Sequence, residues 1–296
     1  MNQEFRIMML GVGNGFVKST YHNNALLEVE GHRFLIDCGA LAWHSLYELG
    51  LGFEDIDGIF ITHLHYDHCG GLDEAALYGA YAAGRKMKLW LPAPLQPILW
   101  GQHLRGTLEN AAEGKISLAD YFDIQTVEEG EIFWLTASSG DGDAEGKVGI
   151  LAEAGSVKEP GILVDAGSDS KAGTLVHAGE AADRPLLAMR WMSTHHVPSK
   201  FSCSLVIDNR FFYSADMVAD ADLVSRLHQQ GITDFYHDCS FDSSPVHASF
   251  QVLCQYPGAI RQHTYLMHYG EAPAGLGEEA LCGMRLLKQH EWRVWS

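Results

Sequence analysis

A dense cluster of histidines and one aspartate, at residues 62–71, constrains this chain more than any other feature of its sequence. The segment reads Thr-His-Leu-His-Tyr-Asp-His-Cys-Gly-Gly and follows a strand-like run at residues 56–61. In extended backbone His63, His65 and Asp67 lie on one side of the chain, and a tight turn then adds His68. Four such side chains can serve two neighbouring metal ions. Imidazole and carboxylate ligands without thiolate suit zinc, and also manganese or iron.

The charge of the chain limits its partners. It carries 20 basic against 38 acidic side chains, which gives a formal net charge of -18. Such a surface repels polyanions, and the sequence contains no basic stripe that could hold long nucleic acid by its phosphates. A small anion bound at a metal site remains compatible with this charge, because divalent ions reverse the local field.

The cysteines and the first residues indicate a cytoplasmic protein. The six cysteines are dispersed and include no CxxC pair. The apolar run at residues 7–10 is too short for a signal-peptide core or a membrane span. We therefore expect reduced thiols, a cytoplasmic location and no contact with a membrane.

Strand patterns come first along the chain and then alternate with helix patterns, which predicts an α/β layered fold. Residues 138–183 are rich in Gly, Ala, Ser and Asp, and we expect them to be an insertion within a single domain that spans residues 1–296. Strands are predicted at residues 5–10, 25–29, 32–36, 56–61, 88–91 (ended by Pro92, Pro94 and Pro97), 201–208, 210–214, 235–237 and 265–267, and helices at 72–83, 219–230 and 249–256.

The strand, the histidine-rich loop at 62–71 and the helix after it resemble the defining motif of the metallo-β-lactamase superfamily. Residues 34–39, Phe-Leu-Ile-Asp-Cys-Gly, also resemble the early strand of that superfamily, which ends in Asp-x-Gly. The matches run from the start of the chain to about residue 270. This resemblance implies a four-layer αββα sandwich with the metal ions at one edge of the sheets.

The resemblance implies three further metal ligands, each at the end of a strand. Residues 213–216, Tyr-Ser-Ala-Asp, are similar to the strand that closes on a metal-bridging aspartate, which gives Asp216 that role. Residues 265–268, Tyr-Leu-Met-His, are similar to the last strand, which delivers His268. The full set implied is His63, His65, Asp67, His68, His196, Asp216 and His268.

The middle ligand is ambiguous because His195 and His196 are adjacent. Registering the strand that starts at residue 201 against the superfamily pattern favours His196. One ion would then bind His63, His65 and His196, the other Asp67, His68 and His268, and Asp216 would bridge them. The resemblance thus implies two divalent ions, zinc or alternatively manganese, and a hydroxide between them as the nucleophile, because metal binding lowers the pKa of water.

Two further segments resemble the branch of the superfamily that contains transfer-RNA 3′-processing ribonucleases and related phosphodiesterases. Residues 237–241, His-Asp-Cys-Ser-Phe, resemble its His-Glu-Ala-Thr-Phe segment, and residues 247–249, His-Ala-Ser, its His-Ser-Thr segment. Both depart from the pattern by one or more residues. The resemblance implies that Asp238 orients His247 and that His247 protonates the leaving oxygen. Asp67, Asp238 and His247 are therefore the expected catalytic residues.

The short distance between His196 and Asp216 argues against transfer RNA as the substrate. In that branch a basic arm that holds the RNA lies between these two ligands, and 20 residues leave no room for it. The chain is more similar to the compact anti-Pycsar cyclic-nucleotide phosphodiesterases of phages and bacteria. This implies hydrolysis of 3′,5′-cyclic nucleotides to nucleoside monophosphates, a part in immune evasion, and a homodimer. His22 and Asn24 are expected near the mouth of the site as contacts to the substrate.

Other functions on the same fold remain open. The chain could be an RNA 3′-processing ribonuclease, a lactonase or another ester hydrolase, or a binding protein that sequesters a nucleotide without cleaving it. A lactonase would not need the pair Asp238 and His247. A sequestering protein would return bound nucleotide unchanged.

Overall fold

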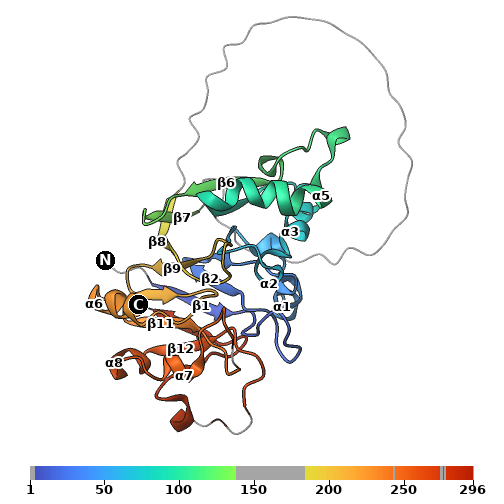
Figure 1. Cartoon of the computed structure of the whole chain (residues 1–296). Helices are drawn as coiled ribbons and strands as arrows, with labels where there is room; N and C mark the ends of the chain where they lie inside the picture. Colours follow the sequence, from blue (N-terminus) through green and yellow to red (C-terminus); the bar gives the residue numbers. More distant parts are fainter. Residues whose placement is uncertain (1–3, 138–183, 243, 274–275, 277, 296) are drawn as a thin grey trace, which may run out of the picture.

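Two β-sheets of seven strands each lie between layers of helices (Figure 1). The computed structural model describes residues 4–137, 184–242, 244–273, 276 and 278–295. The first sheet has the order β14-β1-β2-β3-β4-β5-β6 and the second the order β13-β12-β11-β10-β9-β8-β7. The first sheet consists of β1 (Phe5–Met9), β2 (Ala25–Val29), β3 (His32–Ile36), β4 (Gly58–Phe60), β5 (Met87–Pro92), β6 (Phe122–Val127) and β14 (Trp292–Trp295). The second consists of β7 (Phe133–Ala137), β8 (Arg184–Ser193), β9 (Cys203–Ile207), β10 (Phe211–Tyr213), β11 (Asp234–Asp238), β12 (Thr264–Met267) and β13 (Arg285–Leu286).

Short helices cover the outer face of each sheet. Leu46 and Leu72 pack helices on the first sheet, whereas Val224 and Leu227 pack α6 on the second. The helical elements of the first half are α1 (Ala42–Glu48), η1 (Phe53–Asp55), α2 (Tyr66–Cys69), α3 (Leu72–Tyr78), η2 (Gly79–Ala83), η3 (Ala93–Leu95), α4 (Gln96–Ile98), η4 (Leu99–Leu104), α5 (Arg105–Leu108), η5 (Ala111–Glu113) and η6 (Leu118–Asp120). Those of the second half are α6 (Ala221–Gln229), α7 (Phe250–Leu253), α8 (Gly258–Arg261) and η7 (Glu278–Leu281).

Neighbouring residues of a strand belong to different apolar layers. In β4, Phe60 lies in the core between the sheets, whereas Ile59 packs under the helices of the first sheet. In β10, Phe211 lies in the central core and Phe212 faces the helices of the second sheet. Since side chains alternate along a strand, both faces of each sheet are buried. The four layers are therefore helix, sheet, sheet and helix, as the sequence predicts.

Parallel pairing brings several strand ends to one edge of the sandwich. Strand β3 pairs parallel with β4 in the first sheet, and β11 pairs parallel with both β10 and β12 in the second. The carboxyl ends of parallel strands meet at the same edge of a sheet, and the loops that follow them there lie close together. The segments that contain the candidate metal ligands follow β4, β8, β10 and β12.

Most predicted elements are confirmed, with a few changes in extent. The strands β2 and β3 have the predicted bounds, whereas the helix predicted at residues 249–256 is limited to α7. The sequence analysis missed the helical stretch from η3 to α5. Pro94 and Pro97 read as chain breakers, but each lies in the first turn of a helical element, where proline is tolerated.

The insertion predicted at residues 138–183 lies outside the described residues. Its flanking residues, Ala137 and Arg184, pair across the antiparallel strands β7 and β8. The division of the chain into one domain with an insertion stays a prediction. None of the helices in the described ranges has the length and apolar character needed to cross a bilayer.

One pair of cysteines differs from the expected reduced state. Cys254, at the end of α7, forms a disulfide with Cys282, and their Cα atoms lie 5.5 Å apart. The two residues are 28 positions apart in the chain, so only the tertiary fold brings them together. Cys38, Cys69, Cys203 and Cys239 are free and buried.

Candidate metal centre

The histidine-rich loop connects β4 to α3 and changes conformation within it. His65 has extended backbone, with φ -81° and ψ 152°, and the short helix α2 begins at the next residue. His63 and His65 therefore come from extended chain, whereas Asp67 and His68 come from a helical turn. This change of direction aims the four side chains at two neighbouring positions.

The glycines around this loop are needed for close packing. A Cβ at Gly39 would lie 2.0 Å from the backbone oxygen of Asp67, and one at Gly71 would lie 2.6 Å from the backbone oxygen of Gly39. Gly70 and Gly71 both have negative φ, so the turn itself does not demand glycine. Gly39 and Gly71 thus let the loop pack against the end of β3.

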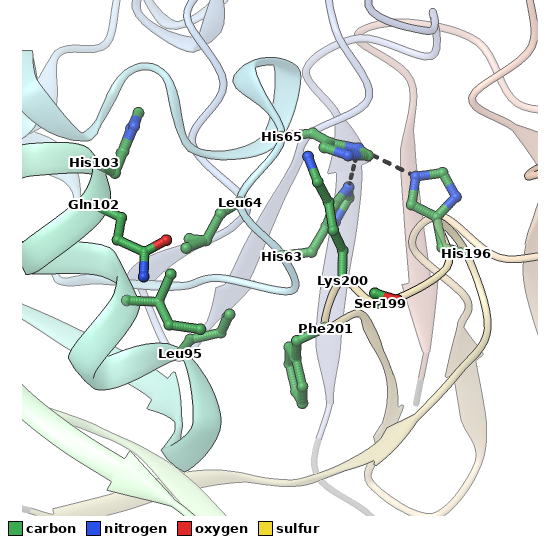
Figure 2. A pocket seen from close by; sticks show the side chains of 11 residues that line it. His63, Leu64, His65, Leu95, Gln102, His103, His196, Ser199, Lys200 and Phe201 are labelled. Carbon is green, nitrogen blue, oxygen red and sulfur yellow. Dashed lines mark hydrogen bonds between the residues drawn. The ribbon is translucent and has the colours of Figure 1, made fainter.

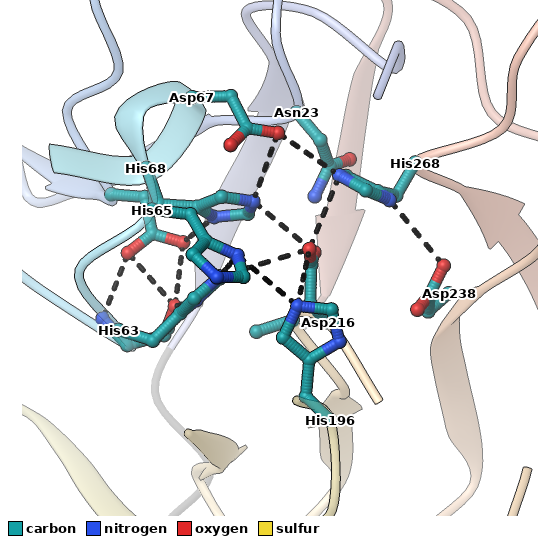
Figure 3. A network of polar contacts seen from close by, with 12 residues as sticks. Asn23, His63, His65, Asp67, His68, His196, Asp216, Asp238 and His268 are labelled. Carbon is teal, nitrogen blue, oxygen red and sulfur yellow. Dashed lines mark hydrogen bonds and ion pairs between the residues drawn. The ribbon is translucent and has the colours of Figure 1, made fainter. Parts of the chain in front are cut away.

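The first group of candidate ligands consists of three imidazoles and one carboxylate (Figure 3). His65 Nδ1 lies 3.1 Å from His63 Nε2 and 3.1 Å from His196 Nε2. Asp216 Oδ2 lies 3.7 Å from His63 Nε2 and 3.6 Å from His196 Nε2. Four donor atoms from three separate segments thus converge on one point.

The second group shares Asp216 with the first. His268 Nε2 lies 3.2 Å from Asp67 Oδ2 and 3.3 Å from Asp216 Oδ2. His68 Nε2 lies 3.1 Å from Asp216 Oδ1 and 3.6 Å from Asp67 Oδ2. Asp216 therefore faces both groups, with its carboxylate between them (Figure 3).

The donor set fits a pair of divalent metal ions. Tetrahedral zinc with Zn–N distances of about 2.0–2.1 Å separates two ligand nitrogens by about 3.3 Å, close to the spacing found here. Within the described residues, the buried atoms His68 Nε2 and Asp216 Oδ1 lie 3.1 Å apart but form no hydrogen bond of normal geometry with each other or with another group. Buried polar atoms are rarely left in this state, and metal coordination would satisfy both.

Burial keeps the first group of imidazoles neutral, which is the form that binds metal. It lowers the pKa of His65 to about 4, with a further contribution from His196 and opposition from Asp216. It also lowers the pKa of His63 and of His196, again against Asp216. A metal ion here would therefore meet little competition from protons near neutral pH.

In the second group, nearby carboxylates have the larger effect on the pKa of the imidazoles. Burial alone would lower the pKa of His268, but Asp216, Asp238 and Asp67 together raise it to about 10. Burial acts in the same way on His68, and Asp216 and other carboxylates raise its pKa well above the usual value. Without a metal ion, protonation of these two imidazoles supplies the positive charge that balances the buried carboxylates.

Three residues of the site have left-handed backbone although they are not glycine. Asp37, Ala215 and His268 have φ of 65°, 49° and 57°, and each lies just beyond the end of a strand. Such conformations cost of order 1–3 kcal/mol and cluster at functional sites. They turn the chain away from β3, β10 and β12 so that the acidic and imidazole side chains face the centre.

Asp238 and His247 lie together beside the two ligand groups. His247 Nδ1 is 2.8 Å from Asp238 Oδ2, and His268 Nδ1 is 3.5 Å from Asp238 Oδ1. The His247 ring centroid is 4.8 Å from that of His268 and 4.8 Å from that of His196. The structure thus brings together two residues that lie nine positions apart in the sequence.

Asp238 makes His247 easier to protonate. Burial would lower the pKa of His247, but the hydrogen bond with Asp238 and its charge outweigh burial and raise the pKa. Asp238 is fully buried, and its hydrogen bond with His247 keeps its own pKa low against the effect of burial. The carboxylate also accepts a hydrogen bond from Met217 N, at 3.0 Å.

The structure distinguishes His195 from His196. The His196 ring lies in the first ligand group, and its Nδ1 is 2.7 Å from the backbone oxygen of Val246. His195 is exposed, and its backbone oxygen accepts a hydrogen bond from Val218 N. Of the two alternatives, His196 is the one with the geometry of a ligand.

The two expected substrate contacts are both buried. Asn24 has no exposed surface, and its side chain is hydrogen-bonded to Gly39 N and to the backbone oxygen of Asp67, each at 2.9 Å. His22 is 3% exposed and stacks edge-on with Tyr66, at 5.9 Å between ring centroids. Asn24 therefore joins the metal loop to Gly39 through hydrogen bonds. A contact of His22 with the substrate stays a prediction.

Asp37 is the main residue of the site to which the sequence analysis gave no role. Its Oδ1 accepts a hydrogen bond from Thr62 N and its Oδ2 accepts one from Thr62 Oγ1, both at 2.8 Å. The carboxylate also lies against His68. The signal was present in the Asp-x-Gly segment that closes β3. What the sequence could not show is which imidazole Asp37 would contact.

Comparison with known proteins agrees with this fold. The family model described as anti-Pycsar protein Apyc1 matches residues 5–140 and 162–293. Anti-Pycsar protein Apyc1 of Paenibacillus xerothermodurans is 34% identical over 268 residues, with 90% of this chain and 88% of that protein covered. The protein of the same name from Bacillus phage 010DV004 is 32% identical over 280 residues, with 92% and 91% covered. The metallo-β-lactamase-fold protein YhfI from Bacillus subtilis superimposes with a TM-score of 0.59 at 12% identity, with 99% of this chain and 100% of YhfI covered. The predicted metallo-β-lactamase sandwich is confirmed.

Proposed function

The chain belongs to the anti-Pycsar Apyc1 family, and from this membership we propose that it is a metal-dependent phosphodiesterase that hydrolyses 3′,5′-cyclic nucleotides to nucleoside monophosphates. The observation that carries the proposal is the position of the Asp238–His247 pair beside the two groups of candidate metal ligands. A lactone or thioester hydrolase has less use for such a pair, since its leaving group needs less help from an acid. The leaving group of a phosphodiester is an alkoxide, which leaves poorly unless an acid protonates it.

We propose that His63, His65 and His196 hold one ion, that Asp67, His68 and His268 hold the other, and that Asp216 bridges the two. Zinc suits these ligands best, and manganese is the alternative. When bound, the ions supply an activated water and polarise the phosphate. The neutral state of the first three imidazoles supports this assignment.

His247 acts as the general acid in this proposal. Its Nδ1 hydrogen is held by Asp238, so Nε2 is the nitrogen that can give a proton to the leaving oxygen. Water adds to phosphorus and releases one proton to solvent, one ester P–O bond breaks, and the proton from His247 Nε2 neutralises the leaving alkoxide. The product is a nucleoside monophosphate, and His247 regains its proton from solvent. Asp238 holds the ring in place and favours its protonated form.

The substrate assignment can be tested with the whole protein. Zinc- or manganese-loaded protein is incubated with several 3′,5′-cyclic nucleotides and with a homoserine lactone, and products are separated by chromatography. We expect nucleoside monophosphates from the cyclic nucleotides, and loss of this activity in a variant with both Asp67→Ala and His68→Ala. Turnover of the lactone alone would remove the phosphodiesterase proposal. Nucleotide that is bound and returned intact would favour sequestration.

The assembly and location also remain proposals. The resemblance to anti-Pycsar phosphodiesterases supports a homodimer in the cytoplasm, with a small phosphodiester as the substrate and no part for long nucleic acid. Light scattering of the purified protein tests the dimer, because a mass near 65 kDa would be about twice that of the 32.6 kDa chain. A mass near that of one chain would contradict it.

A further inference from the structure

A cavity of about 330 Å³ opens beside the first ligand group. His63, His65 and His196 line one side of it, and Figure 2 shows them across the space from side chains of the η3–α4–η4 stretch. The loop before β9 supplies the remaining wall. The other lining residues used here are Leu64, Leu95, Ile98, Gln102, Lys200 and Phe201.

Part of the cavity wall is apolar and firmly held. Leu95 is 2% exposed and belongs to the core under the first sheet. Phe201 packs against that core and the central one, and its ring lies 5.4 Å from the ring of Trp191. This apolar part of the wall favours a flat, largely apolar group such as a base.

Three polar side chains of the cavity wall are available to a ligand. Within the described residues, the side chains of Gln102, Ser199 and Lys200 have no hydrogen-bond or ion-pair partner. Among the residues that the structure describes, Lys200 is the one lysine or arginine that lines the cavity, and in Figure 2 it points toward His65. In a chain of net charge -18, a lysine in this place favours an anion.

The backbone at the far side of the cavity is also unusual. Gln102 and His103 lie in η4, a π-helical turn, and such turns are frequent at functional sites. His103 Nε2 lies 3.5 Å from the Sγ of Cys69, the last residue of the helical turn α2 that contains Asp67 and His68. This contact joins the cavity wall to the metal loop.

We propose that this cavity is the subsite for the nucleoside part of the substrate. The base lies against Leu64, Ile98 and Phe201, and the Lys200 ammonium binds a phosphate oxygen at the border of the metal centre. Pockets for small ligands measure about 300–1,000 Å³, and this cavity of about 330 Å³ has room for one nucleoside. The proposal rests on the proposed function.

Binding of the reaction product tests the subsite without any turnover. Isothermal titration of the zinc-loaded protein with AMP, CMP and inorganic phosphate measures what the nucleoside adds. We expect both nucleotides to bind at least about tenfold more tightly than phosphate, as stacking of a base on an apolar wall provides. Ile98→Trp, which fills the cavity, should abolish this advantage, whereas Ile116→Trp at an exposed position should keep it. Equal affinity for AMP and phosphate in the unaltered protein would overturn the subsite.

The affinity of a Lys200 variant for AMP tests the proposed contact between Lys200 and the phosphate. Lys200→Met should weaken AMP binding by about tenfold and reduce its dependence on salt, because an ion pair with phosphate is lost. The matched control is Lys86→Met, since the Lys86 ammonium is bonded to the backbone oxygen of Ala119 and does not line the cavity. If both variants bind AMP equally well, Lys200 does not contact the phosphate.

A minimal substrate separates failure of the subsite from failure of the proposed function. Trimethylene phosphate has the six-membered cyclic diester but no sugar or base. If it and 3′,5′-cyclic AMP are hydrolysed with equal kcat/KM, the phosphodiesterase stands and the subsite is wrong. If cyclic AMP is favoured by about tenfold or more and Ile98→Trp removes the preference, the subsite is supported. If neither is hydrolysed, the proposed function fails, and the titration with AMP still decides on the subsite.

Discussion

His68 Nδ1 lies 2.6 Å from Asp37 Oδ2, and both side chains are fully buried. This contact fixes the orientation of the ring, so that His68 Nε2 faces Asp216 and the second ligand group. Asp37 is held in turn by Thr62, the residue before the first candidate ligand. The end of β3 therefore orients an imidazole that the loop after β4 supplies.

Replacement of Asp37 should weaken metal binding without removing a ligand. Asp37→Asn is expected to lower zinc affinity by about 10–100-fold, because carboxylates that hydrogen-bond a ligating histidine have effects of this size. Competition with a chromogenic chelator measures the affinity. Asp57→Asn is the matched control, since its carboxylate bonds to His32 and to Arg33 N, away from the metal centre. Equal affinity in the two variants would contradict the role given to Asp37.

Removal of metal should destabilise the fold. The two ligand groups bury carboxylates and imidazoles close together, and a metal that binds only the folded state stabilises it by mass action. At a free zinc concentration about 1,000 times the dissociation constant, the gain is about 4 kcal/mol. Thermal unfolding with and without a chelator measures this shift. An unchanged melting temperature would indicate that no metal binds at these groups.

The activity should fall as the pH rises through the pKa of His247. The general acid must be protonated, and Asp238 raises this pKa, so the active form persists to higher pH than for a free histidine. Asp238→Asn removes the raising effect and should shift the alkaline limb of kcat to lower pH. Profiles of kcat against pH for this variant and for the exposed-site control Asp222→Asn provide the test. A limb that does not move would exclude His247 as the acid.

Loss of the His247 imidazole should reduce the rate and spare the metal. General acid catalysis contributes about 100- to 10,000-fold, so His247→Ala should lower kcat by at least about 100-fold. Zinc content, measured by atomic emission, should remain that of the unaltered protein. Full activity in this variant would instead favour a substrate with a good leaving group, such as a lactone.

Asn24 should affect stability more than binding of the substrate. Asn24→Ala leaves the buried Gly39 N–H without its partner, which costs about 1–3 kcal/mol of unfolding free energy. Urea unfolding measures this loss. AMP should bind with an affinity within about twofold of the unaltered protein. A stable variant with weakened AMP binding would restore the role of Asn24 as a substrate contact.

The disulfide between Cys254 and Cys282 should stabilise the C-terminal part of the chain. It closes a loop between residues 28 positions apart, for which loop-closure entropy predicts about 3–4 kcal/mol. Reduction by dithiothreitol should lower the melting temperature of the unaltered protein and leave that of Cys282→Ser unchanged. If reduction affects neither, the two thiols are not paired in solution.

Local patterns explain why much of the fold could be predicted. The hairpin of β2 and β3 follows from alternation around Glu30 and Gly31, which occupy left-handed backbone with φ of 49° and 82°. The helix α6 follows from its apolar spacing and from Asp220, whose side chain caps Leu223 N. Such signals lie within a few residues of each other. The stretch from η3 to α5 was missed because its helical character depends on packing of Leu99 and Leu104 under the first sheet.

The sequence by itself determined the consecutive residues of the metal loop, the strand that precedes it and the layered α/β class, because each depends on neighbours along the chain. Tertiary structure decided what distant segments do together. It placed His196 and not His195 in the first group, set Asp37 against His68, buried Asn24 and joined Cys254 to Cys282. These outcomes depend on strand register and on which loops meet at one edge of the sandwich, and neither is encoded in the order of neighbouring residues.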